Sequence, residues 1–165
     1  MDTSDLKWVL DRTTEAVRCI DSKNGIITAV LAGIAAILFS NESFSQAVYD
    51  SFASMRALAM LAMVIASIAT VLVVGSLLAS IVPRSKCPSS SSIYAGKIAE
   101  LGSADKYFDS LARNDYSLDD DIASQIYENS RIFERKTTWN RRATIALLFL
   151  IGALIIFSIF YAIGV

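Results

Sequence analysis

The sequence predicts an all-α membrane protein with three transmembrane helices, a small helical cytoplasmic module, and a last helix that continues from the cytoplasm into the membrane. Of the 165 residues, 54% are hydrophobic, which exceeds the usual content of a soluble domain, and they are concentrated in blocks. From Leu118 to Ile151 the chain contains neither Gly nor Pro. No residue there interrupts a helix whose first half is charged and whose second half is apolar.

Three apolar segments account for the predicted spans. Residues 57–82 and 143–165 carry no charge and are long enough to cross a hydrocarbon core of about 30 Å. The first span, residues 25–40, reaches only about 24 Å as a helix. Because a short span is tolerated best where protein surrounds it, we expect this helix near the middle of a homo-oligomer, and we favour a tetramer.

Lys and Arg residues are unevenly distributed among the connections. Segments 1–24 and 83–142 hold all of the 15 Lys and Arg residues except Arg56. Because cytoplasmic connections are rich in positive charge, we expect the N-terminus in the cytoplasm and the C-terminus outside. The predicted segments are a cytoplasmic amphipathic helix (1–24), the first span (25–40), a short external loop (41–56), the second span (57–82), a cytoplasmic helical loop module (83–142) and the third span (143–165).

The cytoplasmic segments have helical signals of their own. An apolar stripe at helical spacing along residues 1–24 predicts packing against another cytoplasmic helix; it consists of Leu6, Val9, Leu10, Thr13, Val17 and Ile20. In the module 83–142, Ser103 is placed to cap a short helix near residues 104–113. Ser117 and Asp120 resemble a capping box at the start of the last helix.

The first span has one side of small residues and one side of bulky aliphatic residues, when it is projected at about 100° per residue. Small residues allow helices to approach closely, and in an oligomer they can equally line an axis. Pore lining and close packing against the second span therefore both stay open. The candidate pore-lining residues are Thr28, Ala32, Ala35, Ala36 and Ser40, with Glu42 as an acidic ring at an outer mouth or as a solvated loop charge.

The composition argues against an enzyme. The chain has no His, and we find no nucleophile with a base, no phosphate-binding Gly-rich loop and no metal-ligand spacing. We therefore expect no catalytic residue, no metal site and no cofactor. The predicted spans also lack the charged residue that ion-coupled transporters use. The remaining classes of protein are a channel or pore, a membrane-disrupting effector, and a membrane-anchored sensor or scaffold.

Three motifs occur in order along the chain. Asp21-x-Lys23-x-Gly25 opens the first span, Ser92-Ile93-Tyr94-x-Gly96-x-Ile98-Ala99 follows the second, and Asn129 and Lys136 precede the third. Together they resemble the transmembrane effectors of the Pycsar type (PycTM-like), a group related to the HalA ion channel of Hailong anti-phage defence. An aromatic residue often stands in such effectors where this chain has Ala95.

The resemblance implies a bacterial anti-phage effector of the inner membrane. Such effectors respond to a nucleotide signal from a partner cyclase or nucleotidyltransferase. The signal is a cyclic pyrimidine mononucleotide in Pycsar systems, whereas an oligodeoxynucleotide holds the HalA channel shut. We therefore expect a homo-oligomeric ion channel, among inner-membrane lipids, that depolarises the membrane and causes abortive infection. The alternative is a nonconducting, membrane-anchored sensor or scaffold that binds a protein partner.

A nucleotide needs cations for its phosphate and flat surfaces for its base. Trp8, Tyr94 and Tyr127 can supply flat surfaces. We expect Asp21, Gly25 and Asn129 to have structural roles. Ion pairs within the protein, such as Glu128 with Arg131, are the competing interpretation for the charged residues. The candidate ligand-binding residues are Arg12, Arg18, Lys23, Tyr94, Lys97, Arg131, Arg135 and Lys136.

Overall fold

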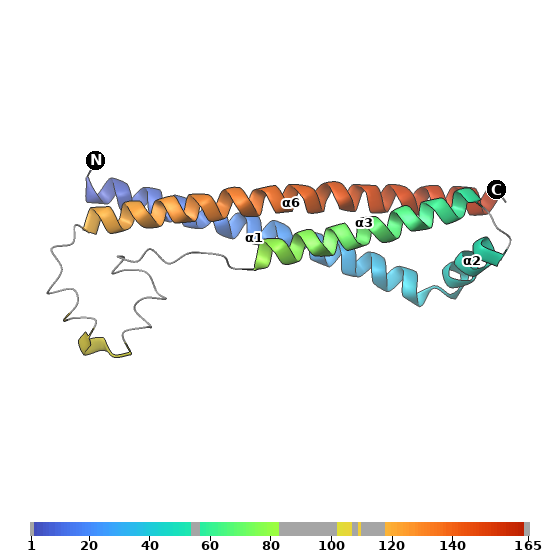
Figure 1. Cartoon of the computed structure of the whole chain (residues 1–165), viewed down its shortest axis with the longest axis horizontal. Coiled ribbons are helices and arrows are strands. Elements are labelled where there is room, and N and C mark those ends of the chain that lie inside the picture. Colours follow the sequence, from blue (N-terminus) through green and yellow to red (C-terminus); the bar gives the residue numbers. More distant parts are fainter. Residues whose placement is uncertain (1, 54–56, 83–101, 107–108, 110–117, 164–165) are drawn as a thin grey trace. The chain divides into compact units, whose positions relative to one another are not determined.

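The computed structural model describes residues 2–53, 57–82, 102–106, 109 and 118–163. Its elements are α1 (Thr3–Ser40), α2 (Glu42–Ala53), α3 (Ala57–Ile81) and α6 (Leu118–Ile163) (Figure 1). No strand occurs within these described ranges. Helices α1, α3 and α6 are each long and apolar enough to cross a membrane. The predicted all-α membrane fold is confirmed.

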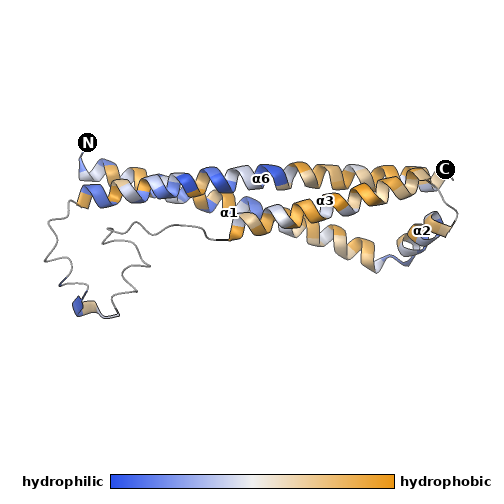
Figure 2. Cartoon of the chain, in the orientation of Figure 1, coloured by the Kyte–Doolittle hydropathy of each residue, from blue (hydrophilic) through white to orange (hydrophobic). Residues whose placement is uncertain are grey.

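Helices α1 and α6 both change character along their length. Figure 2 shows α3 as apolar throughout, whereas α6 begins with polar residues and ends with apolar ones. The predicted continuity of the last helix is confirmed, because α6 extends without a break from Leu118 to Ile163. The absence of Gly and Pro before Gly152 leaves its backbone hydrogen bonding uninterrupted where the sequence changes from charged to apolar.

The chain divides into two compact units, and α1 and α6 each contribute to both. The first unit contains Met1–Ile20 and Pro83–Lys136, and the second contains Asp21–Val82 and Thr137–Val165. Ser117, whose capping role was predicted, and most of the predicted helix near residues 104–113 lie outside the described residues. The backbone N–H of Lys106 donates to Ser103 Oγ at 3.3 Å.

In the first unit, α1 and α6 run parallel. Thr3 Oγ1 donates to Asp119 Oδ1 at 2.9 Å, and Asn129 Nδ2 donates to Thr14 Oγ1 at 3.2 Å. The partners are 116 and 115 residues apart in sequence, so the register changes by only one residue along the pair. Buried or half-buried apolar residues are spaced by three, four or seven positions, as in a coiled-coil seam, and the half-buried Thr14 and Asn129 lie within the gaps of seven. These apolar residues include Leu6, Leu10, Val17, Ile20, Ile122, Ile126 and Phe133.

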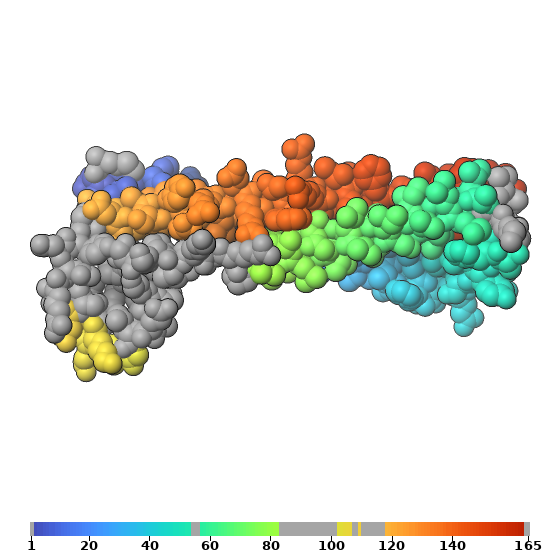
Figure 3. Space-filling view, viewed as in Figure 1, coloured from blue at the N-terminus to red at the C-terminus, as the bar shows by residue number. Residues whose placement is uncertain are grey.

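In the second unit, the core is built mainly from small and aliphatic side chains. Figure 3 shows the atoms of α3 lying against those of the apolar part of α6. Alanine at these contacts lets helix backbones approach closely, which favours packing where lipid surrounds the helices. The buried cluster consists of Ile27, Ala66, Ala69, Val73, Leu77, Ala143, Ala146, Leu147, Leu150 and Ala153.

The first span packs through its bulky side. Ile27 belongs to the buried cluster, and Leu31 and Ile34 pack against it. The small side is open at two positions: a Cβ placed on Gly25 or Gly33 meets no heavy atom of the described chain within 4 Å. Ala35 on the same side is half-buried.

Residues 42–53 form a helix, where the sequence analysis expected only a short loop. The backbone N–H of Phe44 donates to Asn41 Oδ1 at 3.2 Å, which caps the helix start. Phe44, Ala47 and Val48 pack in a second cluster around Phe157, and the rings of Phe44 and Phe157 meet edge to face at 5.7 Å. The apolar residues of this side are spaced by three or four positions, as in an amphipathic helix. The sequence analysis missed this spacing because serine residues lie between them.

Asn24 joins three helices of the second unit. Its side chain is buried, with 5% exposure. Asn24 Nδ2 donates to Ser80 Oγ of α3 at 2.8 Å, and its Oδ1 accepts from Asn140 Nδ2 of α6 at 2.8 Å. Both ends of the amide are therefore used, which stabilises one arrangement of α1, α3 and α6.

We expect Asn24→Ala to lower the free energy of unfolding by about 1–3 kcal/mol, because Ser80 and Asn140 lose a buried partner. Reversible unfolding of the full chain in mixed micelles measures this change. Ser67→Ala is the matched control, since Ser67 is exposed and its hydroxyl bonds only Met63 O of its own helix. Equal unfolding free energies for the two variants would contradict a structural role of Asn24.

Candidate functional site

The first unit has a hollow on the surface of α1. Its volume is about 390 Å³, and it is lined by Trp8, Asp11, Arg12, Thr14, Glu15 and Arg18. All six come from consecutive turns of one helix. Two of the predicted ligand-binding residues, Arg12 and Arg18, therefore share one hollow with the predicted stacking residue Trp8.

The arginines of this hollow are held by weak contacts. The Arg12 guanidinium carbon lies 5.5 Å from the centre of the Trp8 ring, and Trp8 is 62% exposed. Arg18 Nη1 lies 4.0 Å from Glu15 Oε2, with both side chains mostly exposed. Exposed ion pairs of this kind contribute at most about 1 kcal/mol. A phosphate could displace Glu15 from Arg18 at low cost.

The hollow is balanced in charge. Asp11 and Glu15 lie beside Arg12 and Arg18, so the two carboxylates offset the two guanidiniums. A polyanion of many phosphates would meet these carboxylates and be repelled by them. A ligand with one phosphate and one base needs only a guanidinium and the Trp8 ring, which suits this surface better.

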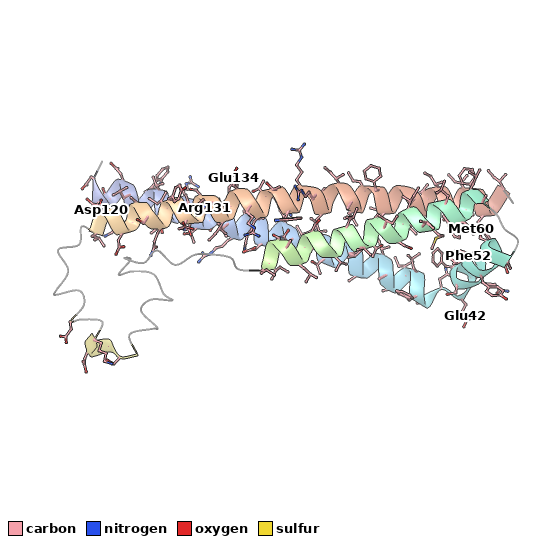
Figure 4. The ribbon with its side chains drawn as sticks, in the orientation of Figure 1. Glu42, Phe52, Met60, Asp120, Arg131 and Glu134 are labelled. Carbon is pink, nitrogen blue, oxygen red and sulfur yellow. The ribbon has the colours of Figure 1, made fainter. Side chains whose placement is uncertain are left out.

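Helix α6 carries a second exposed pair of an aromatic residue and an arginine. The Arg131 guanidinium carbon lies 5.9 Å from the centre of the Tyr127 ring. Arg131 Nη1 also donates to Glu128 Oε1 at 3.1 Å, which is the intrahelical pairing that the sequence suggested. Figure 4 shows Arg131 in the first half of α6. Arg131 therefore has a stronger intramolecular partner than Arg18 has.

The remaining candidate ligand residues are distributed over both units. Arg135 and Lys136 are half-buried on α6 in the first unit, whereas Lys23 is exposed on α1 in the second. Tyr94 and Lys97 lie outside the described residues.

The residues expected to be structural are all described. Asp21 and Gly25 lie exposed on α1 in the second unit. Asn129 bonds Thr14 across the helix pair of the first unit.

Most of the candidate pore residues lie on the open side of α1. Ala32 and Ala36 are exposed, whereas Ala35 is half-buried. The hydroxyls of Thr28 and Ser40 bond backbone oxygens of their own helix, at Asn24 and Ile37 respectively. Glu42 is exposed in the first turn of α2 (Figure 4). This surface is less polar than its residue types suggest, because both hydroxyl hydrogens are used within the helix.

Sequence reasoning overlooked the two carboxylates of the hollow and the buried Asn24. The signal for Asn24 was its place in the apolar spacing of α1, between Ile20 and Ile27. A polar residue at such a seam position often fixes the register of paired helices. The signal for Glu15 was its spacing of three residues from both Arg12 and Arg18, and the signal for Asp11 was its spacing of four residues from Glu15, which places the carboxylates and the arginines on neighbouring turns.

A family model described as the Pycsar effector protein domain (PycTM) matches residues 5–164. The match includes almost all of α1, all of α2 and α3, and all of α6. The chain belongs to the Pycsar effector family. No curated protein and no solved structure matches the chain.

Membership in the Pycsar effector family indicates the general function of the chain. This Pycsar effector is a multi-pass membrane protein of anti-phage defence. The family implies activation by a cyclic nucleotide from a partner cyclase. The family and the helical membrane structure both support a non-enzymatic effector.

A double-mutant cycle measures how much the hydrogen bond between Asn129 and Thr14 contributes to stability, without any ligand present. We expect Asn129→Ala and Thr14→Ala each to cost about 1 kcal/mol and to show a coupling energy of about 0.5–1.5 kcal/mol, because each removes the same hydrogen bond. Unfolding of the four proteins without nucleotide gives these values.

Ser130→Ala is the control for this cycle. Ser130 is exposed and its hydroxyl bonds only Ile126 O, so the expected loss is within about 0.5 kcal/mol. Additive effects of the two single substitutions would show that Asn129 does not fix the helix pair through Thr14.

Proposed function

We propose that this Pycsar effector is a homo-oligomeric ion channel of the bacterial inner membrane, gated from the cytoplasm by a cyclic nucleotide. Opening depolarises the membrane and aborts the infection. The observation that supports this proposal most is the continuity of α1 and α6. Each helix carries an exposed aromatic–arginine pair in its polar part and is apolar enough farther along to cross a membrane.

The hollow at Trp8 is the proposed signal site. A base stacks on Trp8, and the cyclic phosphate takes charge-assisted hydrogen bonds from Arg12 and Arg18. The carboxylates of Asp11 and Glu15 supply acceptors for ribose or base N–H groups and disfavour longer polyanions. Charge balance and family membership together favour a cyclic mononucleotide over the oligodeoxynucleotide.

The proposed gating step is a change in helix packing. Bound phosphate takes Arg18 from Glu15 and alters the balance of charge along the helix pair of the first unit. Because α1 and α6 continue without a break into their apolar parts, a shift of either helix is carried into the membrane. The ligand must bind one packing more tightly than the other for this to occur.

The open side of α1 is the proposed contact between subunits. Gly33 allows close approach of a second helix, Ala32 and Ala36 beside it face the shared axis, and the short apolar stretch of α1 is accommodated best within a protein assembly. We favour a tetramer with the N-terminus in the cytoplasm, the C-terminus in the periplasm and Glu42 near the outer mouth. Rings of Glu42 carboxylates would favour cations.

Loss of the hollow's guanidiniums should weaken nucleotide binding. We expect the double substitution Arg12→Ala and Arg18→Ala to raise the Kd for a cyclic pyrimidine mononucleotide by about a hundredfold or more, since each of the two lost charge-assisted hydrogen bonds is worth roughly 1.5–3 kcal/mol. Calorimetry on the purified protein measures Kd, and ion flux from liposomes measures the response.

Lys7→Ala is the matched control for this experiment. Lys7 is an exposed cation on α1 that does not line the hollow, so its loss removes one positive charge, as each single substitution Arg12→Ala or Arg18→Ala does, and leaves the site. An equal rise in Kd for Lys7→Ala and for the single arginine variants would indicate nonspecific charge attraction. Liposomes that stay impermeable with bound nucleotide would favour the nonconducting scaffold.

The pore assignment is tested by cysteine modification. In a background with Cys19→Ser and Cys87→Ser, we expect a charged thiol reagent to reduce flux through Ala32→Cys by about tenfold, because it adds bulk and charge at the pore wall. Ile159→Cys is the control, at an exposed position of α6 that we assign to lipid. Unchanged flux after complete labelling of Ala32→Cys would exclude α1 as the pore wall.

A further inference from the structure

Helix α2 has three sides with different chemistry. The side toward the core contains Ala47 and Ser51, which are buried, with Phe44 and Val48 packed toward Phe157. At about 100° per residue, Tyr49 and Phe52 fall on a second side with Ser45 between them, Ser43, Gln46 and Asp50 fall on the third, and Glu42 lies at the boundary between these two sides. We call the second side the aromatic flank and the third the polar flank.

The aromatic flank is uncovered in the subunit. Tyr49 is 73% exposed and Phe52 is 49% exposed. Large aromatic surfaces are costly to leave in water, at roughly 25 cal/mol for each Å². The polar flank already gives α2 a side that can face water. Contact with water therefore does not account for the two aromatic residues exposed on the aromatic flank.

A groove adjoins the core side of α2. Its volume is about 370 Å³, and it lies between the end of α1, helix α2, and the facing parts of α3 and α6. Its lining is mainly apolar and includes Leu38, Phe39, Phe44, Val48, Met63 and Leu154. A groove of this composition fits a hydrocarbon chain better than a polar ligand.

The chain fixes how far α2 can lie from the membrane. Asn41 alone separates the end of α1 from the start of α2, and residues 54–56 separate α2 from α3. Because α1 and α3 are spanning helices, connections this short hold α2 at the level where both leave the hydrocarbon. The exposed apolar residues of α3, such as Leu58 and Leu61, continue the lipid-facing surface toward this level.

We propose that α2 is a membrane-interface helix whose aromatic flank and adjoining groove bind phospholipid. Tyr49 and Phe52 lie among the headgroups and upper acyl chains, where aromatic residues are favoured. An acyl chain enters the groove beside Phe39 and Phe44, and the polar flank faces water. The proposal rests on α2 itself and is independent of the ligand and the conductance proposed above.

Depth-dependent fluorescence quenching tests this placement. Trp8→Phe and Trp139→Phe remove both native tryptophans, and Tyr49→Trp or Gln46→Trp then introduces a single probe on the aromatic or the polar flank. The full chain is reconstituted in phosphatidylcholine vesicles brominated near the top of the acyl chain. We expect quenching by bromine to be at least about twofold stronger for Tyr49→Trp, and quenching by aqueous iodide to be stronger for Gln46→Trp.

Phe52→Trp provides a second probe on the aromatic flank and should behave as Tyr49→Trp does. Iodide quenching of both aromatic-flank probes equal to that of Gln46→Trp would overturn the proposal, since α2 would then lie in water. Shielding of these probes from both iodide and brominated lipid would also overturn it, because another copy of the chain would then cover the flank.

Discussion

Unbroken backbone hydrogen bonding along α1 and α6 is the constraint on which the rest of this molecule depends. A helix satisfies its own N–H and C=O groups in water and in lipid alike, so one element can have a charged part and an apolar part. Only the contacts of the side chains differ between the charged part and the apolar part of the helix. Thr3 and Thr14 bond α6 in the first unit, and alanine contacts replace most polar ones in the second.

Polar side chains make weak, exposed contacts in the first unit and buried hydrogen bonds in the second. In the first, exposed arginines lie over aromatic rings and beside carboxylates, where each contact is weak and exchangeable. In the second, Asn24 is buried and fully hydrogen-bonded, where loss of a partner is costly. The effector therefore combines a surface whose polar contacts are weak with an interior whose polar contacts are costly to break.

The sequence was sufficient to predict three apolar helices and the continuity of α6, because composition and the absence of Gly and Pro are local properties. It was insufficient for α2, since the apolar side of that helix depends on Phe157, which is distant in the chain. It was insufficient for Asn24 for the same reason, as both partners come from other helices. The positive charge of the arginines was enough to predict them as candidate ligand residues. That Asp11 and Glu15 offset this charge in the hollow could not be predicted, because it depends on which turns of α1 stay exposed.

The open side of α1 has a consequence for sequence variation. A Cβ placed on Gly33 meets no heavy atom of the described chain within 4 Å, and alanine there would favour the helix by up to about 1 kcal/mol. The packing of the described chain therefore does not require glycine at this position. If alanine proves not to be tolerated there, the reason lies outside the packing of this chain, so this position separates the requirements of folding from those of any contact that the folded chain makes.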